Sequence, residues 1–296
     1  MEYVLRTMDL TKNYGNKTVV DKVNINIAKG DIYGFIGKNG AGKTTTMKMV
    51  LGMIFPTSGE IELFGEKAND AARHRIGSLI EAPGLYKDLT AYENLRRFSM
   101  LYGGDDKEIK EVLELVDLAN TGKKKAGEFS LGMRQRLGIA LAMLGKPDLL
   151  ILDEPVNGLD PSANKRIRDA ILRLNRERGV TFFISSHLLG ELAKISTRYG
   201  IINGGHLVEE VSAKELEERC RQSLSIRCGN PAIAAQTLEQ AFSVKPQING
   251  DTVTVYSGFE RAAEINEALV CAGAGVFDFH AANSDMEEYF IERIGR

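Results

Sequence analysis

The chain has 296 residues, of which 43% are apolar, so it can bury a hydrophobic core in one large domain or two ordinary ones. The formal net charge is -2 at pH 7 and the basic residues are spread along the chain, which disfavours a nucleic-acid-binding protein. The three cysteines have no CxxC spacing, so we expect neither a disulfide framework nor a zinc site, and a reducing compartment fits them.

The N-terminal part of the chain is predicted to form strands. Residues 1–10 contain charged side chains instead of a continuous apolar run, so we do not expect a signal peptide. Residues 19–27 alternate between apolar and polar and are followed by Lys-Gly-Asp, which is typical of antiparallel strands joined by turns. Residues 32–36 are a short apolar run, which indicates a buried strand.

A glycine-rich loop follows this strand and precedes a helical stretch at residues 44–51. It reads Gly-Lys-Asn-Gly-Ala-Gly-Lys-Thr and matches the phosphate-binding pattern GxxxxGK[ST], in the strand–loop–helix context that makes an accidental glycine turn a poor alternative. Its backbone N–H groups can surround phosphates at a helix N-terminus. Lys43 is expected to reach the β- and γ-phosphates and Thr44 to bind Mg²⁺. The predicted ATP-binding residues here are Gly37, Lys38, Asn39, Gly40, Ala41, Gly42, Lys43, Thr44 and Thr45.

Residues from about 85 to 145 are predicted to be mainly helical, and a buried strand at residues 149–152 follows them. This strand ends in Asp153 and Glu154, at the edge where open α/β sheets bind their ligands. We expect Asp153 to hold the magnesium shell and Glu154 to polarise a water for in-line attack on the γ-phosphate. Taken alone, the two acids fit a simple charge pair at a strand end equally well.

Strands and helices alternate in the remainder of this region, with a helix at 163–178 and a strand at 181–185, which predicts a parallel sheet. After about residue 211 the pattern changes to a smaller module. Its order of elements is strand, helix, strand, strand, helix, strand and a last helix, which is a ferredoxin-like arrangement. An Asn-Gly pair at 249–250 predicts the hairpin turn, and Ser284 with Glu287 predicts a capping box for the last helix.

The order of these motifs resembles the ATP-binding cassette (ABC) family over about residues 2–215. Residues 129–136, which read Phe-Ser-Leu-Gly-Met-Arg-Gln-Arg, occupy the place of the family's signature segment before the acidic strand. The resemblance assigns residues 157–160 to a loop that communicates across a dimer, His187 to the switch histidine and Tyr14 to the aromatic that stacks on adenine. It also implies that Ser130 and Gly132 contact the ATP held by the facing subunit.

The resemblance implies an α/β fold of the P-loop NTPase class, with a mixed core sheet, an antiparallel β subdomain and a helical subdomain at about 85–145. The cassette would span residues 1–215, and residues 216–296 would form a small α+β accessory domain. The implied catalytic residues are Glu154, His187 and Lys43, the implied magnesium ligands are Thr44, Glu81 and Asp153, and the ATP-binding set gains Tyr14, Ser130, Gly132 and Asp160.

Two positions depart from the common family pattern. Glu81 stands where most cassettes have glutamine, and a carboxylate there can still bind magnesium or its water but adds negative charge beside the phosphates. The signature has Leu131 in place of glycine and Met133 in place of glutamine. Both features resemble the bacitracin-resistance and lantibiotic-immunity branch, whose members help to expel peptide antibiotics.

The function that the resemblance implies is an ATPase subunit that dimerises around ATP and powers a separate membrane permease, for export of or immunity to peptide antibiotics. No segment reaches the roughly 18 apolar residues that cross a bilayer, so any membrane role must come through a partner. The resemblance implies a cytoplasmic subunit that its permease holds at the inner face of the membrane. Exposed apolar residues such as Leu85, Tyr86 and Tyr92 would receive that partner. The alternative is a soluble ABC ATPase that acts on ribosomes or DNA, and such proteins typically carry two cassettes or a long coiled-coil insertion, which this sequence lacks.

Overall fold

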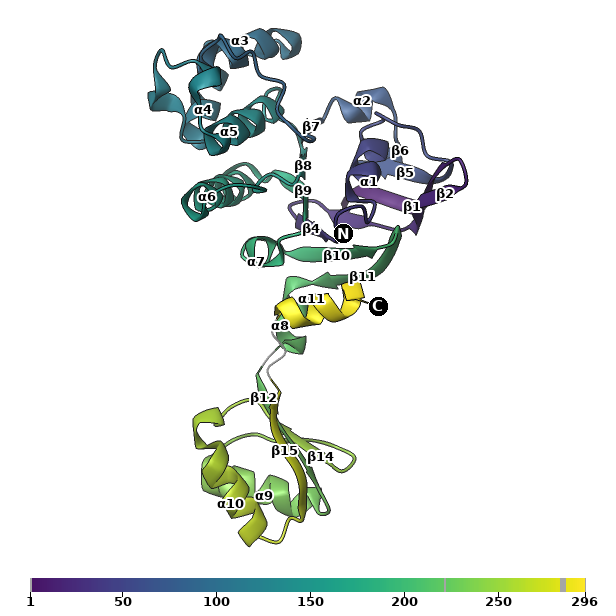
Figure 1. Cartoon of the computed structure of the whole chain (residues 1–296), viewed down its shortest axis with the longest axis vertical. Helices are drawn as coiled ribbons and strands as arrows, with labels where there is room; N and C mark the ends of the chain where they lie inside the picture. Colours follow the sequence, from purple (N-terminus) through teal and green to yellow (C-terminus); the bar gives the residue numbers. More distant parts are fainter. Residues whose placement is uncertain (1, 221, 283–285, 296) are drawn as a thin grey trace. The chain divides into compact units, whose positions relative to one another are not determined.

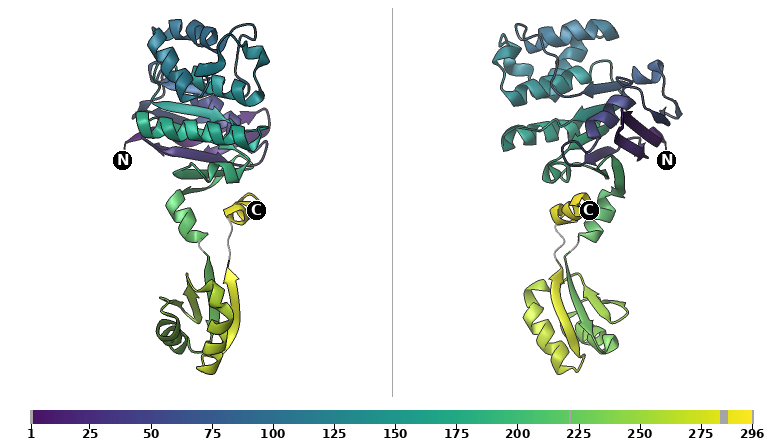
Figure 2. Two further views of the ribbon diagram at one scale, coloured as in Figure 1. Left: turned by 90° about the vertical axis from the view of Figure 1, so that its left-hand side faces the viewer. Right: turned by 45° about the vertical axis from the view of Figure 1, so that its right-hand side comes forward.

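The computed structural model describes residues 2–220, 222–282 and 286–295, so the capping box expected at Ser284 lies outside the described residues. The chain divides into two compact units (Figures 1 and 2). The first unit runs to Ala213 and includes the last few residues from Arg293, and the second runs from Lys214 to Glu292. Each unit has its own hydrophobic core.

A six-stranded mixed sheet forms the centre of the first unit. Its strand order is β11-β10-β4-β9-β8-β7, parallel throughout except for β11, which pairs antiparallel with β10. Strands β4, β8 and β9 are buried on both faces, which is typical of strands inside a parallel sheet. The strands are β4 (Ile32–Ile36), β7 (Ile76–Leu79), β8 (Leu149–Asp153), β9 (Thr181–Ser186), β10 (Arg198–Asn203) and β11 (His206–Ser212). The prediction of parallel strands is confirmed.

An antiparallel sheet lies beside it, with the order β2-β1-β5-β6 and with β3 paired to β1. Side chains of both sheets and of α1 share one core, because Leu5, Phe35, Met47, Leu63 and Ile151 belong to the same buried cluster. This shared core fixes α1 against the edge where β4 and β8 end. The elements are β1 (Tyr3–Tyr14), β2 (Lys17–Val23), β3 (Asn26–Ala28), α1 (Lys43–Val50), β5 (Ser58–Leu63) and β6 (Glu66–Lys67).

The helices follow their sequence signals closely. Thr90 and Glu93 form a capping box at the start of α3, and Gly103 ends that helix in the left-handed conformation. The buried guanidinium of Arg136 donates to the carbonyl oxygens of Val116 and Asp117, which ties α5 to the end of α4. The helices are α2 (Asp70–Arg73), α3 (Ala91–Tyr102), α4 (Asp106–Leu115), η1 (Ala119–Thr121), η2 (Ala126–Glu128), α5 (Leu131–Ala142), α6 (Pro161–Arg178) and α7 (Leu189–Leu192).

The apolar residues expected on the surface of the helical region are only partly exposed. Tyr86 is exposed, whereas Leu85 and Tyr92 are half-buried, and the Tyr92 hydroxyl donates to Asp106. The expected exposure is therefore confirmed for Tyr86, and Leu85 and Tyr92 present only part of their surface. Within the described part of the chain, no helix is long and apolar enough to span a membrane.

The second unit has an antiparallel four-stranded sheet with the order β13-β14-β12-β15, which is the predicted ferredoxin-like arrangement (Figure 1). Its core contains Leu224, Ile226, Val253, Ile265 and Leu269. The predicted turn joins β13 to β14, with Gly250 at φ 60°. The elements are α8 (Ala213–Arg219), β12 (Ser223–Cys228), α9 (Pro231–Phe242), β13 (Gln247–Asn249), β14 (Thr252–Val255), η3 (Phe259–Arg261), α10 (Ala262–Cys271), β15 (Val276–Ala282) and α11 (Met286–Gly295).

Candidate functional site

The glycine-rich loop joins the buried end of β4 to the start of α1. Gly42 precedes the helix at φ 108°, a conformation that side chains rarely adopt, and a Cβ there would lie 2.8 Å from the carbonyl oxygen of Val19. A Cβ at Gly37 would clash with the carbonyl oxygen of Ile202. The loop can therefore follow this path only with glycine at both positions. Its backbone approaches a helix N-terminus, where an anion is stabilised.

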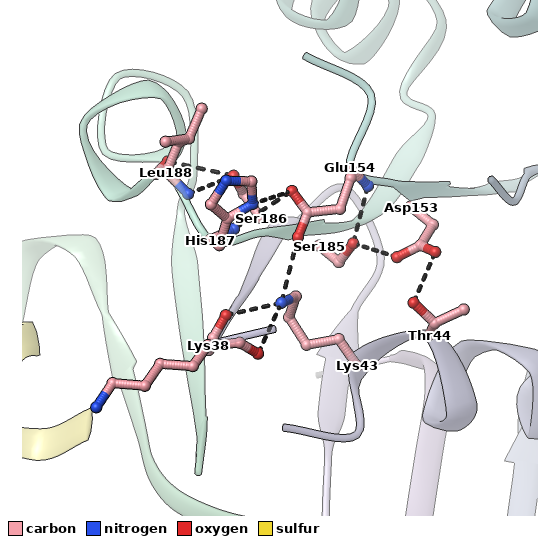
Figure 3. Close-up of polar contacts among 10 residues, drawn as sticks. Lys38, Lys43, Thr44, Asp153, Glu154, Ser185, Ser186, His187 and Leu188 are labelled. Atoms are coloured by element: carbon pink, nitrogen blue, oxygen red, sulfur yellow. Dashed lines mark hydrogen bonds and ion pairs between the residues drawn. The ribbon is translucent and has the colours of Figure 1, made fainter. Parts of the chain in front are cut away.

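Lys43 is 5% exposed, and its ammonium group lies at the centre of the loop. It donates to the carbonyl oxygens of Gly37 at 2.7 Å and Lys38 at 3.2 Å (Figure 3). It also forms an ion pair with Glu154, with 3.2 Å between Nζ and Oε1, although that carboxylate oxygen has no hydrogen-bond partner of good geometry. A buried ammonium with a single opposing carboxylate is well placed to accept a further anion.

Glu154 connects Lys43 to His187. The Nδ1 atom of His187 lies 2.7 Å from Oε2 of Glu154, and the two residues follow the ends of β9 and β8 (Figure 3). Glu154 has φ 49°, an unfavourable conformation for a residue with a side chain, and such strained positions are frequent at functional sites. The ends of β8 and β9 and the start of α1 thus bring Lys43, Glu154 and His187 into a continuous row of contacts.

Asp153 is held by two hydroxyl groups. Thr44 Oγ1 donates to Oδ2 at 2.8 Å, and Ser185 Oγ donates to Oδ1 at 2.6 Å (Figure 3). Ser185 also accepts a hydrogen bond of 2.9 Å from the backbone N–H of Glu154. Sequence reasoning missed Ser185, since only the pairing of β8 with β9 places it opposite Asp153.

The Thr44–Asp153 pair is the candidate magnesium site. No group of three or more His, Cys, Asp or Glu side chains that suits a metal occurs among the residues that the structure describes. Mg²⁺ takes oxygen ligands and commonly only one or two from the protein, with phosphate oxygens and waters as the others. A hydroxyl and a carboxylate at the N-terminus of α1 therefore fit this ion.

Glu81 pairs with Lys48 on α1 instead of with Thr44 or Asp153. Its carboxylate accepts a 2.6 Å hydrogen bond from the ammonium group of Lys48 on α1, and its backbone has φ 62°. The hydrogen bond to Glu81 raises the pKa of Lys48, and the negative charges of Glu81 and Asp153 act in the same direction. Lys48 is thus a second cation at this site that sequence reasoning missed.

The other residues predicted to bind the nucleotide of the same chain differ in their exposure. Tyr14, at the end of β1, is 52% exposed, with the ammonium group of Lys12 at 5.0 Å from its ring centroid. An exposed ring can stack on a base. Lys38 and Asn39 are exposed on the loop, and Thr45 is half-buried in α1.

Ser130, Gly132 and Asp160 lie at the starts of two helices, and their hydrogen bonds run within those helices. Ser130 accepts from the Met133 N–H at 3.3 Å and begins α5, and Asp160 accepts from the Ser162 and Ala163 N–H groups and begins α6. The hydrogen bond from the Ser162 hydroxyl, followed by that from the Ala163 N–H, lowers the pKa of Asp160. A Cβ on Gly132 would lie 2.9 Å from the Ala163 Cβ, so α5 and α6 are in close contact at these starts.

Comparison with known proteins gives consistent results. The sequence model of the family described as "ABC transporter" matches residues 20–157. The chain is 45% identical to the bacitracin transport ATP-binding protein BcrA of Bacillus licheniformis, over 100% of this chain and 98% of that protein. It is 42% identical to the lantibiotic transport ATP-binding protein SrtF of Streptococcus pyogenes, over 70% of this chain and 90% of that protein.

Solved structures share the fold of the first unit. The structure of cbiO1 from Clostridium perfringens, part of the ABC transporter complex cbiONQ, superposes with a TM-score of 0.68 at 24% identity, covering 74% of this chain and 92% of that one. The structure of an ATP-binding subunit of an ABC transporter superposes with a TM-score of 0.64 at 28% identity, covering 73% of this chain and 92% of that one.

Proposed function

The chain belongs to the ABC transporter family of ATP-binding proteins, and from this premise we propose how its residues bind ATP, hydrolyse it and serve transport. It is an ATPase subunit whose ATP hydrolysis is coupled to transport through a separate permease. The observation that carries the proposal is the chain of contacts Lys43–Glu154–His187 beside the Thr44–Asp153 pair.

In the proposed binding mode, the β- and γ-phosphates of ATP enter the loop formed by residues 37–44. The buried ammonium group of Lys43 turns from Glu154 toward the phosphates, since their charge exceeds that of one carboxylate. Adenine stacks on the exposed ring of Tyr14. Magnesium would be held by Thr44 and Asp153, and it would neutralise charge on the phosphate oxygens. Glu81, which is paired with Lys48, would hold one of the magnesium waters.

Glu154 is the proposed general base. Once Lys43 engages the phosphates, the Glu154 carboxylate is free to accept a proton from a water aligned with the γ-phosphate. His187 holds that carboxylate through Nδ1 and leaves its other ring nitrogen to address the γ-phosphate. Ser185 fixes the backbone N–H of Glu154 and the carboxylate of Asp153 at once, so base and magnesium ligand keep a constant separation.

The second nucleotide contact is proposed to come from another copy of the chain. Ser130 and Gly132 begin α5, and a helix N-terminus with a hydroxyl that can still donate a hydrogen bond can address a phosphate. The side-chain hydrogen bond of Ser130 comes from the Met133 N–H of the same helix, so its hydroxyl proton is available to the ATP held by a facing subunit. Asp160, at the start of the adjoining α6, would face the same interface. Two nucleotides would then be buried between two subunits.

The proposed cargo is a peptide antibiotic of the bacitracin or lantibiotic type. The support is the identity of 45% to a bacitracin transport ATP-binding protein over the full chain, together with Glu81 and the altered signature residues. The subunit would work at the cytoplasmic face of the membrane, attached to its permease, with residues 1–215 as the motor and 216–296 as an accessory domain. Expression with that permease should raise resistance to bacitracin, and the Glu154→Gln variant should abolish the gain.

ATP hydrolysis by the purified chain tests the proposed site. Lys43→Met should lose nucleotide binding, because no other buried cation faces the loop among the described residues. Glu154→Gln should keep nucleotide binding but lose at least about a hundredfold in turnover, which is the usual effect of removing a general base. Lys110→Met and Glu114→Gln, on the exposed face of α4, serve as matched controls and should behave as wild type. Unchanged turnover in Glu154→Gln would remove it from this role.

A further inference from the structure

Lys48 and Glu81 form an ion pair next to the nucleotide site. Lys48 lies four residues after Thr44 on α1, so the two side chains share one face of the helix. Thr44 points to Asp153, and one turn later the Lys48 ammonium donates to Oε1 of Glu81 at 2.6 Å. The pair is therefore adjacent to the candidate magnesium site.

The carboxylates around the loop each have a different partner. Glu154 faces Lys43, and Glu81 faces Lys48. Asp153 receives only hydroxyl groups, from Thr44 and Ser185. Without Lys48, Glu81 would add an unpaired negative charge to a site that must accept the several negative charges of ATP.

We propose that Lys48 is a positioning residue that compensates for the carboxylate at position 81, so that the pair presents no net charge to the bound nucleotide. The inference rests on the proposed function, because it assumes that ATP binds in the loop beside this pair. Glutamine at position 81 would be neutral by itself, and the Lys48–Glu81 pair is neutral only as a unit.

Stability does not explain the pair. The side chains of Lys48 and Glu81 are 31% and 68% exposed, and exposed ion pairs contribute little to folding. The backbone of Glu81 is nevertheless held at φ 62°, an uncommon conformation for a residue with a side chain, which directs its carboxylate to α1. The effect of the pair should thus appear in ligand binding and not in the melting temperature.

The two single variants should change the affinity for ATP in opposite directions. Lys48→Met leaves Glu81 uncompensated and should weaken binding of a fluorescent non-hydrolysable ATP analogue with Mg²⁺ by about three- to fivefold, the scale expected for one partly screened charge. Glu81→Gln leaves Lys48 uncompensated and should tighten binding by a similar factor. The double variant and Lys48→Arg should both return close to wild type.

The control pair is Arg75 and Asp148, with 2.7 Å between Nε and Oδ2 and with both side chains about half exposed. Arg75→Met and Asp148→Asn should leave the dissociation constant unchanged. If Lys48→Met fails to fold, the Glu81→Gln variant still tests the proposal, because only charge compensation predicts tighter binding of the analogue. The inference would be overturned if both single variants changed the dissociation constant in the same direction, or if neither changed it. A wild-type chain that does not bind the analogue would instead refute the proposed function.

Discussion

At the scale of single residues, Ser185 connects the proposed magnesium ligand Asp153 to the proposed base Glu154. Its hydroxyl donates to Asp153 and accepts from the backbone N–H of Glu154, and its side chain is fully buried. Removing a buried hydroxyl that makes one donated and one accepted hydrogen bond leaves both of its partners unsatisfied. We therefore assign Ser185 the role of fixing the magnesium ligand relative to the base.

Ser185→Ala should lower ATP turnover about tenfold and cost about 1–3 kcal/mol of unfolding free energy, because the Glu154 amide loses its acceptor in a buried place. Ser99→Ala is the matched control, since Ser99 is also buried but its hydroxyl bonds only the Arg96 carbonyl oxygen within α3. Turnover and urea denaturation of both variants give the comparison. If Ser99→Ala lost as much turnover as Ser185→Ala, the loss would reflect stability alone.

The residues of the site divide into those that local sequence predicts and those that it does not. Lys43, Thr44, Asp153 and Glu154 were predictable because the loop pattern and the acidic strand end are continuous in sequence. Ser185 acts through a neighbouring strand, and strand order is not visible in a local pattern.

At the scale of elements, the starts of α5 and α6 touch each other. The Cα of Gly132 lies so close to Ala163 that a Cβ would come within 2.9 Å of the Ala163 methyl group, and a Cβ on Gly158 would lie 3.6 Å from Leu131. The small side chains bring the two helix starts together. Since Ser130 and Asp160 cap these helices, the contact fixes their relative position.

Ala163→Leu should force α5 and α6 apart, because the added atoms have no room beside Gly132. Binding of ATP to the loop should remain, while turnover should fall about tenfold if the two helix starts must act together across a dimer. Lys165→Leu adds a similar side chain on the exposed side of α6 and should have no effect. Wild-type turnover in Ala163→Leu, with a correctly folded protein, would show that this contact has no part in catalysis.

The elements themselves were largely predictable, because apolar periodicity and caps are local. The hairpin with Gly250 and the helix that begins after the glycine loop follow their sequence signals. The partial burial of Tyr92 was not predictable, since its hydroxyl reaches Asp106 at the start of α4, a tertiary contact that no local pattern shows.

At the scale of the whole molecule, each of the two units contains a hydrophobic core of its own. The core of the first unit includes Phe35 and Ile151 from the central sheet, and that of the second includes Ile226 and Leu269. All the candidate ATP-binding residues belong to the first unit. Nucleotide binding should therefore be independent of the packing inside the second unit.

Ile226→Ala tests this separation. Ile226 is fully buried in the second core, so its truncation should cost that unit about 2–5 kcal/mol. The dissociation constant for ATP should not change. Leu152→Ala, in the strand that carries Asp153, is the matched core truncation in the first unit and should weaken binding. Isothermal titration of the two variants decides, and a large loss of affinity in Ile226→Ala would show that the units do not act independently.

In the proposed ATP-bound state, two copies of the chain enclose ATP between the loop of one and the start of α5 of the other. The direct measurement is the mass in solution of the Glu154→Gln variant with ATP and Mg²⁺. We predict that this variant is a dimer with ATP and a monomer without it. Adding Ser130→Arg, which blocks the start of α5, should keep it monomeric even with ATP. A Glu154→Gln variant that binds ATP and stays monomeric at every concentration would contradict the claim.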